Sequence, residues 1–351
     1  MVTPIDPDAR PVWEQRWHPL RREWVVVASH RQDRPWLGER VPASSVVALA
    51  HDGGCTFCPG NVRLSSVVNP DYRGIHVFDN DRPCVGADAP RELETPPKGY
   101  RSAPATGIAR VVCFSERHDQ QLARMAVTAV DDVLRCFQSQ YRELAARPEV
   151  AHVLMFENRG EATGVSNLHP HGQIYATNFV FQTIQNEVEA CREHFAAQRR
   201  SLWEDVVAPE VADGRRVIAQ NAAAVAFLPW FARYAYETFV GPRRSVASIA
   251  DLGDDERRAL AAVLHETLVR FDNLWRMPFP YVMALHQAPT NGDDHSGFGF
   301  HIELHPPLRK PGLRKFLAGP ETGGGNFLAD TAPEDKAREL RAVAATHYDL
   351  P

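Results

Sequence analysis

A run of polar residues near the middle of the chain carries the residue types that group-transfer chemistry needs. It begins as Phe156-Glu157-Asn158-Arg159-Gly160 and continues as Ser166-Asn167-Leu168-His169-Pro170-His171-Gly172-Gln173. Because alternate residues of a strand point to one face, we expect His169, His171 and Gln173 to line one surface. Such a row offers a nucleophilic imidazole beside neutral hydrogen-bond donors. The same spacing also fits a metal site that uses both histidines, or a polar strand face without chemistry.

A pair of cysteines precedes this run, in the segment Cys55-Thr56-Phe57-Cys58. Two thiolates at this spacing form one half of a tetrahedral zinc site, which needs two further ligands. His118 and His169 are the candidates for these ligands. A pair of buried or redox-active thiols is the alternative, but nothing nearby resembles a thioredoxin unit. The spacing therefore favours a structural zinc site.

The first eighty or so residues place arginines near aromatic and amide side chains. These residues are Arg31, Arg34, Phe78, Asn80 and Asp81. An arginine fork matches phosphate oxygens, an aromatic ring can stack a base, and amide or carboxylate groups can bind its edge or the ribose. The group is thus a candidate nucleotide site. Arginines in loops are also commonly just solvated, which is the alternative.

The elements that must position these residues follow from the pattern of apolar side chains. Short apolar runs predict strands at 24–28, 110–114, 152–156, 224–228, 281–285 and 298–304. Helical spacing predicts helices at 119–147, 186–203, 251–274 and 333–345. Each half contains a strand, a long helix, a strand, a polar loop and a strand with polar residues at alternate positions, His169-Pro-His171 or His301-Ile-Glu303-Leu-His305. This weak repeat predicts two copies of one α+β unit that share antiparallel sheets.

The composition limits the class of protein. The chain has 351 residues, 44% hydrophobic and 24% charged, with a formal net charge of −5. The length suffices for a large core, and the absence of a long basic run argues against a nucleic-acid partner. No window is apolar for the length of a membrane span, and the N-terminus is polar and broken by proline. We therefore expect a cytoplasmic protein that contacts no membrane.

The polar run resembles the signature of the galactose-1-phosphate uridylyltransferase family, the transferase branch of the histidine-triad superfamily. The resemblance continues in order along nearly the whole chain. It includes the segments Pro19 to Trp36, Cys55-x-x-Cys58-Pro-Gly-Asn61, Asn69-Pro-Asp-Tyr72, Val77-Phe-Asp-Asn-Asp81, Val112-Cys-Phe-Ser-Glu-Arg-His118 and Arg314-Lys-Phe316.

The resemblance assigns roles by position. It implies that His171 is the nucleophile that becomes uridylylated, that Gln173 hydrogen-bonds the transferred phosphoryl group and that Ser166 contacts a phosphate. It implies a zinc ion on Cys55, Cys58, His118 and His169. It implies a nucleotide site at Arg31, Arg34, Phe78, Asn80, Asp81 and Asn158, and a hexose site at Lys315, Phe316 and Glu321.

The resemblance also implies a second metal site, for iron or zinc, on Glu187, His286 and His301. Glu303 stands where a third histidine is expected. A carboxylate can still bind a hard metal, His305 is another candidate ligand, and a buried polar network is the alternative. The hexose loop departs as well, because Glu321 lacks a preceding tyrosine and Gly323-Gly-Gly325 follows it. This leaves the sugar and the nucleobase open.

The predicted fold is α+β, with duplicated histidine-triad-like halves and a mainly antiparallel sheet flanked by helices. We predict an N-terminal half at 1–185, with the nucleophile and the zinc site, and a C-terminal half at 186–351, with the sugar-binding loop. The predicted function is the exchange of UMP between UDP-glucose and galactose 1-phosphate by a homodimer, with ping-pong kinetics. One alternative is a relative, including a phosphorylase, that uses another nucleotide or sugar 1-phosphate. The other is a zinc-stabilised nucleotide-binding module without catalysis.

Overall fold

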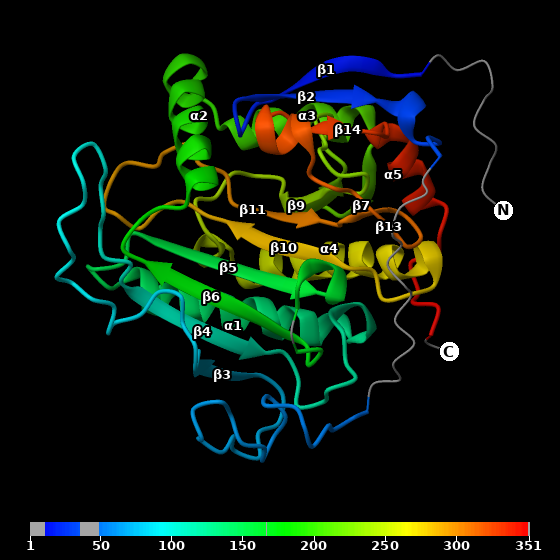
Figure 1. The fold of residues 1–351 in the computed structure, drawn as a ribbon. Helices are drawn as coiled ribbons and strands as arrows, with labels where there is room; N and C mark the ends of the chain where they lie inside the picture. Colours follow the sequence, from blue (N-terminus) through cyan, green and yellow to red (C-terminus); the bar gives the residue numbers. More distant parts are fainter. Residues whose placement is uncertain (1–10, 36–48, 166, 350–351) are drawn as a thin grey trace.

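One antiparallel sheet runs through the whole protein in the computed structural model, which describes residues 11–35, 49–165 and 167–349. Every pair of neighbouring strands in this nine-stranded sheet is antiparallel (Figure 1). From edge to edge the strands are β3 (His76–Asp79), β4 (Gly107–Cys113), β6 (His171–Thr177), β5 (His152–Arg159), β10 (Tyr281–His286), β11 (His301–His305), β9 (Thr238–Pro242), β8 (Ala224–Phe227) and β7 (Val217–Gln220).

The strand order repeats in reverse about the centre of the sheet. In one half, β4 leads through helix α1 (Val127–Ala145) to β5, and a hairpin returns as β6. In the other half, β9 leads through helix α4 (Asp254–Trp275) to β10, and a hairpin returns as β11. The halves join where β5 pairs with β10. The repeat predicted from the sequence is therefore confirmed, and so is the α+β class with a mainly antiparallel sheet.

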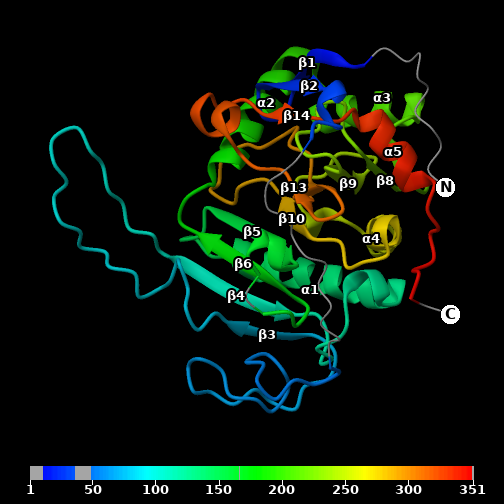
Figure 2. The ribbon, with the colours of Figure 1, turned by 45° about the vertical axis from the view of Figure 1, so that its right-hand side comes forward.

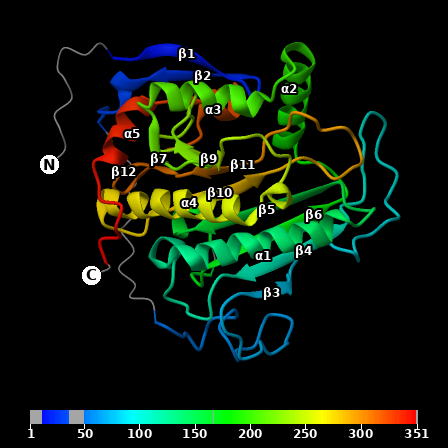
Figure 3. The same ribbon diagram turned by 180° about the vertical axis from the view of Figure 1, so that it is seen from behind.

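Helices α1 and α4 lie side by side on one face of the sheet (Figure 3). Buried residues of α1 recur every three or four positions, at Val130, Val133, Leu134, Phe137, Tyr141 and Leu144, so one apolar side of the helix packs on the sheet. Acidic residues fill the first turn of α4, where the helix dipole favours negative charge. The main apolar core lies between these helices and the sheet.

A second layer covers the other face of the sheet in the C-terminal half (Figure 1). It contains helices α2 (Gln182–Gln198) and α3 (Leu202–Asp213), and a three-stranded sheet of β1 (Trp13–His18), β2 (Glu23–Ala28) and β14 (Leu328–Ala329). Helix α5 (Pro333–Arg341) packs instead against β7 and α4 and contributes to the main core. Strands β12 (Leu308–Lys310) and β13 (Leu313–Arg314) form a hairpin before the π-helical turn η5 (Gly319–Gly323).

The remaining segments lie near the β3 edge or form single turns. Figure 2 shows the segment that precedes β3 against that edge, and the loop between β3 and β4 extending away from the body. The short 3-10 turns are η1 (Ser29–Arg31), η2 (Leu122–Arg124), η3 (Glu161–Thr163) and η4 (Ile249–Asp251). Within the described ranges, no helix has both the length and the apolar character that a bilayer crossing requires.

Several element boundaries differ from those predicted. The predicted helix at 186–203 is two helices, because Arg199 adopts a left-handed φ of 55° and ends α2. The helix predicted from residue 119 begins at Val127, after the separate turn η2, and the strand predicted from residue 298 begins at His301. The predicted division at residues 185 and 186 falls within α2 and stays a prediction.

Candidate active site and metal centres

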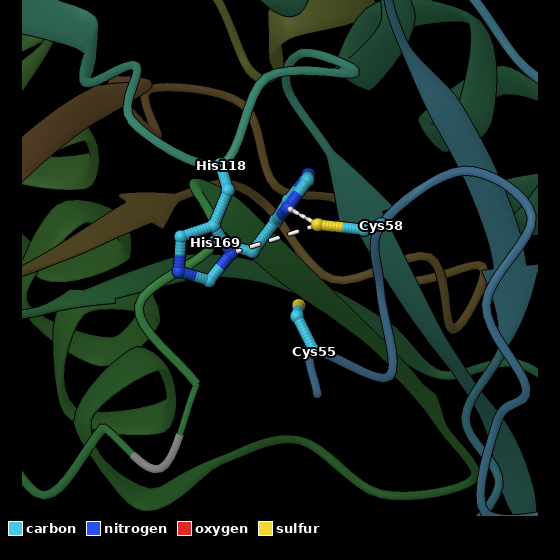
Figure 4. A group of neighbouring side chains, drawn as sticks. All are labelled: Cys55, Cys58, His118 and His169. Atoms are coloured by element: carbon cyan, nitrogen blue, oxygen red, sulfur yellow. Dashed lines mark hydrogen bonds between the residues drawn. The ribbon is translucent and has the colours of Figure 1, made fainter. Parts of the chain in front are cut away.

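Two cysteines and two histidines from separate parts of the chain meet beside the β4–β6 edge (Figure 4). We call Cys55, Cys58, His118 and His169 the thiolate cluster; all four are buried and offer ligand atoms within 4.8 Å of one another. The Cys58 Sγ lies 3.7 Å from Nδ1 of His118 and 3.5 Å from Nδ1 of His169. Tetrahedral zinc with ordinary bond lengths would set a sulfur and a nitrogen ligand about 3.6 Å apart. These residues therefore fit a zinc ion.

Two asparagines hold the cysteine loop in this shape. The Asn61 amide donates to the carbonyls of Asp52 (2.8 Å) and Cys55 (2.7 Å). The Asn69 amide donates to the carbonyls of Thr56 (2.9 Å) and Cys58 (3.0 Å). Burial raises the pKa of the Cys58 thiol to about 11. A cation bound in the cluster would stabilise the thiolate form that burial disfavours.

The outer nitrogen of His169 is fixed by groups behind it. Its Nε2 lies 2.8 Å from the Ser115 carbonyl oxygen, to which Nε2–H donates, and 3.2 Å from the Tyr72 hydroxyl. The Tyr72 hydroxyl itself donates to the Phe57 carbonyl at 2.8 Å. Burial lowers the pKa of His169 to about 4, so the ring is neutral and Nδ1 is a lone-pair donor facing Cys58. Tyr72 was not among the residues predicted for the site, although the Asn69-Pro-Asp-Tyr72 segment contains it.

His171 is the first residue of β6 and stands next to Cys113 of β4 in the sheet register. Its Nδ1 lies 2.7 Å from the carbonyl oxygen of His169. Because a carbonyl can only accept, Nδ1 carries the proton and Nε2 keeps its lone pair. Burial lowers the pKa of His171, against the opposite effect of this hydrogen bond. The result is a neutral imidazole, two residues away from a candidate metal ligand, with a lone pair that can act as a nucleophile.

Amide side chains lie on the same face as His171. Gln173 follows two positions along β6, and its Oε1 lies 3.5 Å from Asn80 Nδ2 and 3.2 Å from the Tyr175 hydroxyl. Gln173 also pairs with Phe156 of β5. Asn158 lies two residues further along β5, on the same face of that strand as Phe156. The predicted residues Gln173 and Asn80 are thus in contact, two positions along β6 from His171.

An aromatic group borders this face. The Phe57 ring meets the His171 ring edge-on, with 4.9 Å between centroids, and meets the Phe78 ring at 5.6 Å. The Arg63 guanidinium lies 4.4 Å from the centre of the Phe78 ring and 3.7 Å from the Asp81 carboxylate. Phe78 and Asp81 therefore lie in the same region as Asn80, as predicted. Phe57 and Arg63 are further members that the sequence did not indicate.

Comparison with known proteins fits this geometry. Residues 3–180 match the N-terminal domain of galactose-1-phosphate uridyl transferase, and residues 187–351 match the C-terminal domain. The chain belongs to the galactose-1-phosphate uridylyltransferase family.

Relatives within the uridylyltransferase family match almost end to end. The galactose-1-phosphate uridylyltransferase of Haemophilus influenzae is 34% identical over 349 residues, 99% of each chain. That of Saccharomyces cerevisiae is 32% identical over 350 residues, 95% of each chain. A solved uridylyltransferase mutant superposes with a TM-score of 0.76 at 27% identity, covering 96% of this chain and 99% of its own. An ADP-glucose phosphorylase from Arabidopsis thaliana, solved with bound ADP-glucose, shares the fold, with a TM-score of 0.75 at 22% identity and coverage of 94% and 98%.

Other residues predicted from the uridylyltransferase resemblance lie in the second layer, with other partners. Arg31 is 3.4 Å from the Asp330 carboxylate, and Arg34 is exposed. Lys315 pairs with Glu321 at 2.8 Å, and the Glu321 carboxylate also accepts from the backbone N–H groups of Ala318 and Leu328. Phe316 is half-exposed. Ser166 lies outside the described residues.

A second group of buried polar residues lies in the C-terminal half of the chain, on the sheet face that also carries His171. We call Glu187, His286, His301 and Glu303 the carboxylate cluster; their ligand atoms also lie within 4.8 Å of one another. Glu187 lies 2.8 Å from His286 Nδ1, and Glu303 lies 3.5 Å from His286 Nε2 and 3.4 Å from His301 Nε2. Carboxylate and imidazole donors suit a harder divalent metal. The three ligands predicted from the sequence are therefore neighbours, and Glu303 is the fourth.

His301 repeats the geometry of His171 in the other half of the fold. It is the first residue of β11, and its Nδ1 lies 2.8 Å from the Gly299 carbonyl. However, the Trp203 ring stacks on it, with centroids 4.8 Å apart and planes 11° apart. His301 is 0% exposed, whereas His171 is 9% exposed. Of this pair of imidazoles, only His171 retains some exposure to solvent.

Proposed function

We propose that this chain transfers UMP from UDP-glucose to galactose 1-phosphate through a uridylyl group on His171. One observation carries the proposal: the carbonyl of His169 holds the proton of His171 on Nδ1, which leaves the Nε2 lone pair for attack. Membership of the family supports the reaction class. The relatives from Haemophilus influenzae and Saccharomyces cerevisiae, which carry the name galactose-1-phosphate uridylyltransferase, support the substrates.

The reaction proceeds in two displacements at one phosphorus. In the first, Nε2 of His171 attacks the α-phosphorus of UDP-glucose; an N–P bond forms, the P–O bond to the β-phosphate breaks, and glucose 1-phosphate leaves with the electron pair. This leaving group needs little help from an acid, because the second pKa of a phosphate monoester is about 6. In the second, a phosphate oxygen of galactose 1-phosphate attacks, and His171 departs as a neutral imidazole. The kinetics are ping-pong.

The neighbouring side chains bind and orient the substrates in this proposal. Gln173, Ser166 and Asn158 contact the phosphoryl oxygens. The nucleotide is held by Arg31, Arg34, Phe78, Asn80 and Asp81, and the hexose by Lys315, Phe316 and Glu321. We further propose that the active form is a homodimer. Size-exclusion chromatography with light scattering tests the dimer, and a monomeric mass under assay conditions would reject it.

Zinc is the proposed occupant of the thiolate cluster, held by Cys55, Cys58, His118 and His169. The ion would supply a fixed positive charge that orients the His169 ring and with it the His169 carbonyl. The residues of this chain then do the rest: that carbonyl holds Nδ1–H of His171, and the orientation of Nε2 is set before substrate arrives. The carboxylate cluster is the proposed site of a second metal, iron or zinc.

Intact-protein mass spectrometry tests the nucleophile directly. The chain is mixed with UDP-glucose alone, and we expect a mass increase of one uridylyl group that disappears when galactose 1-phosphate is added. His171→Ala should show no increase, whereas His301→Ala should still be modified if it folds. A protein that binds the nucleotide without modification would reject the proposal and favour a binding module.

The same assay tests the substrates. The Glu321 carboxylate already accepts from Lys315 and from two backbone N–H groups. Its contact with the sugar should therefore differ from the contact that a free carboxylate would make. A panel of UDP-glucose, UDP-galactose and ADP-glucose, followed by galactose 1-phosphate, glucose 1-phosphate or inorganic phosphate, identifies both partners. Modification by ADP-glucose alone, with discharge by phosphate, would replace the uridylyltransferase by a phosphorylase acting through the same His171.

A further inference from the structure

Two carboxylates of the carboxylate cluster lie where water does not reach them. Glu187 and Glu303 are both 0% exposed. A buried carboxylate without a compensating charge is costly, and removing one partner of a buried ion pair is strongly destabilising. A divalent ion would supply compensation when bound.

Arg21 provides a positive charge from within the protein. It lies in the turn between β1 and β2, and its Nη2 is 2.5 Å from Oε2 of Glu303. Its Nη1 donates to the Thr183 hydroxyl at 3.1 Å. Thr183 is the second residue of helix α2, which also carries Glu187. Arg21 therefore ties the β1–β2 turn both to the cluster and to the helix that supplies another member of it.

The two oxygens of Glu303 face different partners. Oε2 receives Arg21 and lies 3.0 Å from His305 Nε2 and 3.5 Å from His286 Nε2, whereas Oε1 lies 3.4 Å from His301 Nε2. Each oxygen thus faces an imidazole of the cluster, but only Oε2 accepts from Arg21. A metal ion bound through Oε1 would leave the Arg21 contact intact.

No other guanidinium among the described residues pairs as closely with Glu303. Arg233 Nη2 is 3.7 Å from Glu303 Oε2, but it pairs with Glu237 at 2.6 Å. His305 bridges the two carboxylates, with Nδ1 3.0 Å from Glu237. Arg233 balances Glu237, which leaves Arg21 as the guanidinium that compensates Glu303.

We propose that Arg21 is a built-in counter-cation for Glu303, which lets the carboxylate cluster stay folded when it holds no metal ion. This inference does not depend on the transfer of UMP. The thermal stability of the chain should accordingly depend little on metal at the carboxylate cluster. When a neutral residue replaces Arg21, a bound metal ion becomes the main counter-charge for Glu303, and the thermal stability of the chain becomes metal-dependent.

The test compares the full chain with Arg21→Gln and with Arg22→Gln. Arg22 is a matched control, because it is adjacent and pairs with Glu189 and Glu193 of α2, but it is exposed. Melting temperatures are measured after chelation and after addition of Zn²⁺, Mn²⁺ or Fe²⁺, with metal content determined by elemental mass spectrometry. All three proteins contain the thiolate cluster, so its contribution cancels.

We expect chelation to lower the melting temperature of Arg21→Gln by roughly 5–10 °C more than that of the parent chain or Arg22→Gln. An equal drop in all three proteins would overturn the proposal. If Arg21→Gln does not fold, the double variant Arg21→Gln/Glu303→Gln decides, because it removes both charges. Folding of the double variant supports the charge pairing, and its failure to fold shows that Arg21 acts through packing instead.

Discussion

The reactive state of His171 depends on a single backbone contact. The His169 carbonyl fixes the proton on Nδ1, and burial keeps the ring neutral. His301 makes the equivalent contact with Gly299, yet Trp203 closes its face. The difference between the proposed nucleophile and the proposed metal ligand therefore lies in what covers the ring, since the ring and its tautomer are the same.

The pH dependence of uridylylation should report the pKa of His171. Only the neutral ring can attack, and burial lowers its pKa below the ordinary value of 6.5. We expect the single-turnover rate with UDP-glucose to stay level as the pH falls to 6.5, and then to decline by about tenfold per unit below the shifted pKa. Rapid-quench measurements across this range check the prediction. An inflection at or above pH 6.5 would contradict it.

Loss of one thiol should remove the zinc ion before it affects anything else. Cys55→Ser takes away one of four ligands, so we expect zinc content to fall from about one ion per chain toward none, together with a lower melting temperature. Cys84→Ser is the control, because Cys84 is exposed and lies outside the thiolate cluster. Elemental mass spectrometry and thermal unfolding give the two readouts. Unchanged zinc in Cys55→Ser would show that the metal assignment is wrong.

The sequence predicted which residue types form this site, but it predicted few of the contacts between them. The spacing of Cys55 and Cys58 and the alternation of His171 and Gln173 follow from local pattern, and the structure brings these residues together as expected. Tyr72 contacts His169, 97 positions along the chain, and Arg63 contacts Phe78 across an irregular loop. Such contacts have no local periodicity, so only the fold reveals them.

At the scale of elements, β6 positions the nucleophile because it packs closely on α1. Gly172 follows His171 and turns toward the helix, where a Cβ would lie 2.9 Å from Phe137, 3.0 Å from Phe114 and 3.1 Å from the Phe156 carbonyl. The alternation of the strand was predictable, whereas its start at His171 was not. His169 lies before the start of the strand, where Cys58 and the Ser115 carbonyl contact its ring.

Gly172→Ala should push β6 away from α1 and move His171. Overpacking of this kind costs about 1–3 kcal/mol of unfolding free energy, and a small displacement of the nucleophile lowers the uridylylation rate by about tenfold or more. Urea unfolding and single-turnover kinetics measure the two effects. Gly53→Ala is the matched control, because a Cβ there meets nothing within 4 Å. If Gly172→Ala had the stability of the parent chain, the space between β6 and α1 would accommodate the added methyl group, contrary to this prediction.

At the scale of the whole molecule, the duplicated halves share one sheet but cover it differently. The second layer fills the outer face of the C-terminal half and encloses His301, while the corresponding face beside β6 carries His171, Gln173 and Asn158. The repeat was visible in the sequence as a pattern of elements. The unequal covering was not, because it depends on α3 and β1, which carry no motif that predicts where they pack.

A buried ion pair joins the halves next to the active site. Arg159 ends β5, one residue after Asn158, and contacts Asp272 of α4 through two bonds of 2.7 Å. Burial alone would raise the pKa of Asp272, but Arg159 and His347 hold it below the ordinary value. A carboxylate with a depressed pKa contributes stability that is complete above its unfolded pKa of 3.8 and is lost as the pH falls below it.

Asp272→Asn should therefore destabilise the whole chain, since it removes the carboxylate that pairs with the buried Arg159. We expect a loss of about 3–5 kcal/mol in the free energy of unfolding at pH 8, where Asp272 is ionised. Asp255→Asn, at an exposed pair with Arg258, is the control and should change the free energy of unfolding little.

Calorimetry should show one cooperative transition in both the parent chain and Asp272→Asn, since the sheet is continuous across β5 and β10. Two separate transitions in the parent chain would mean that the halves fold independently despite the shared sheet.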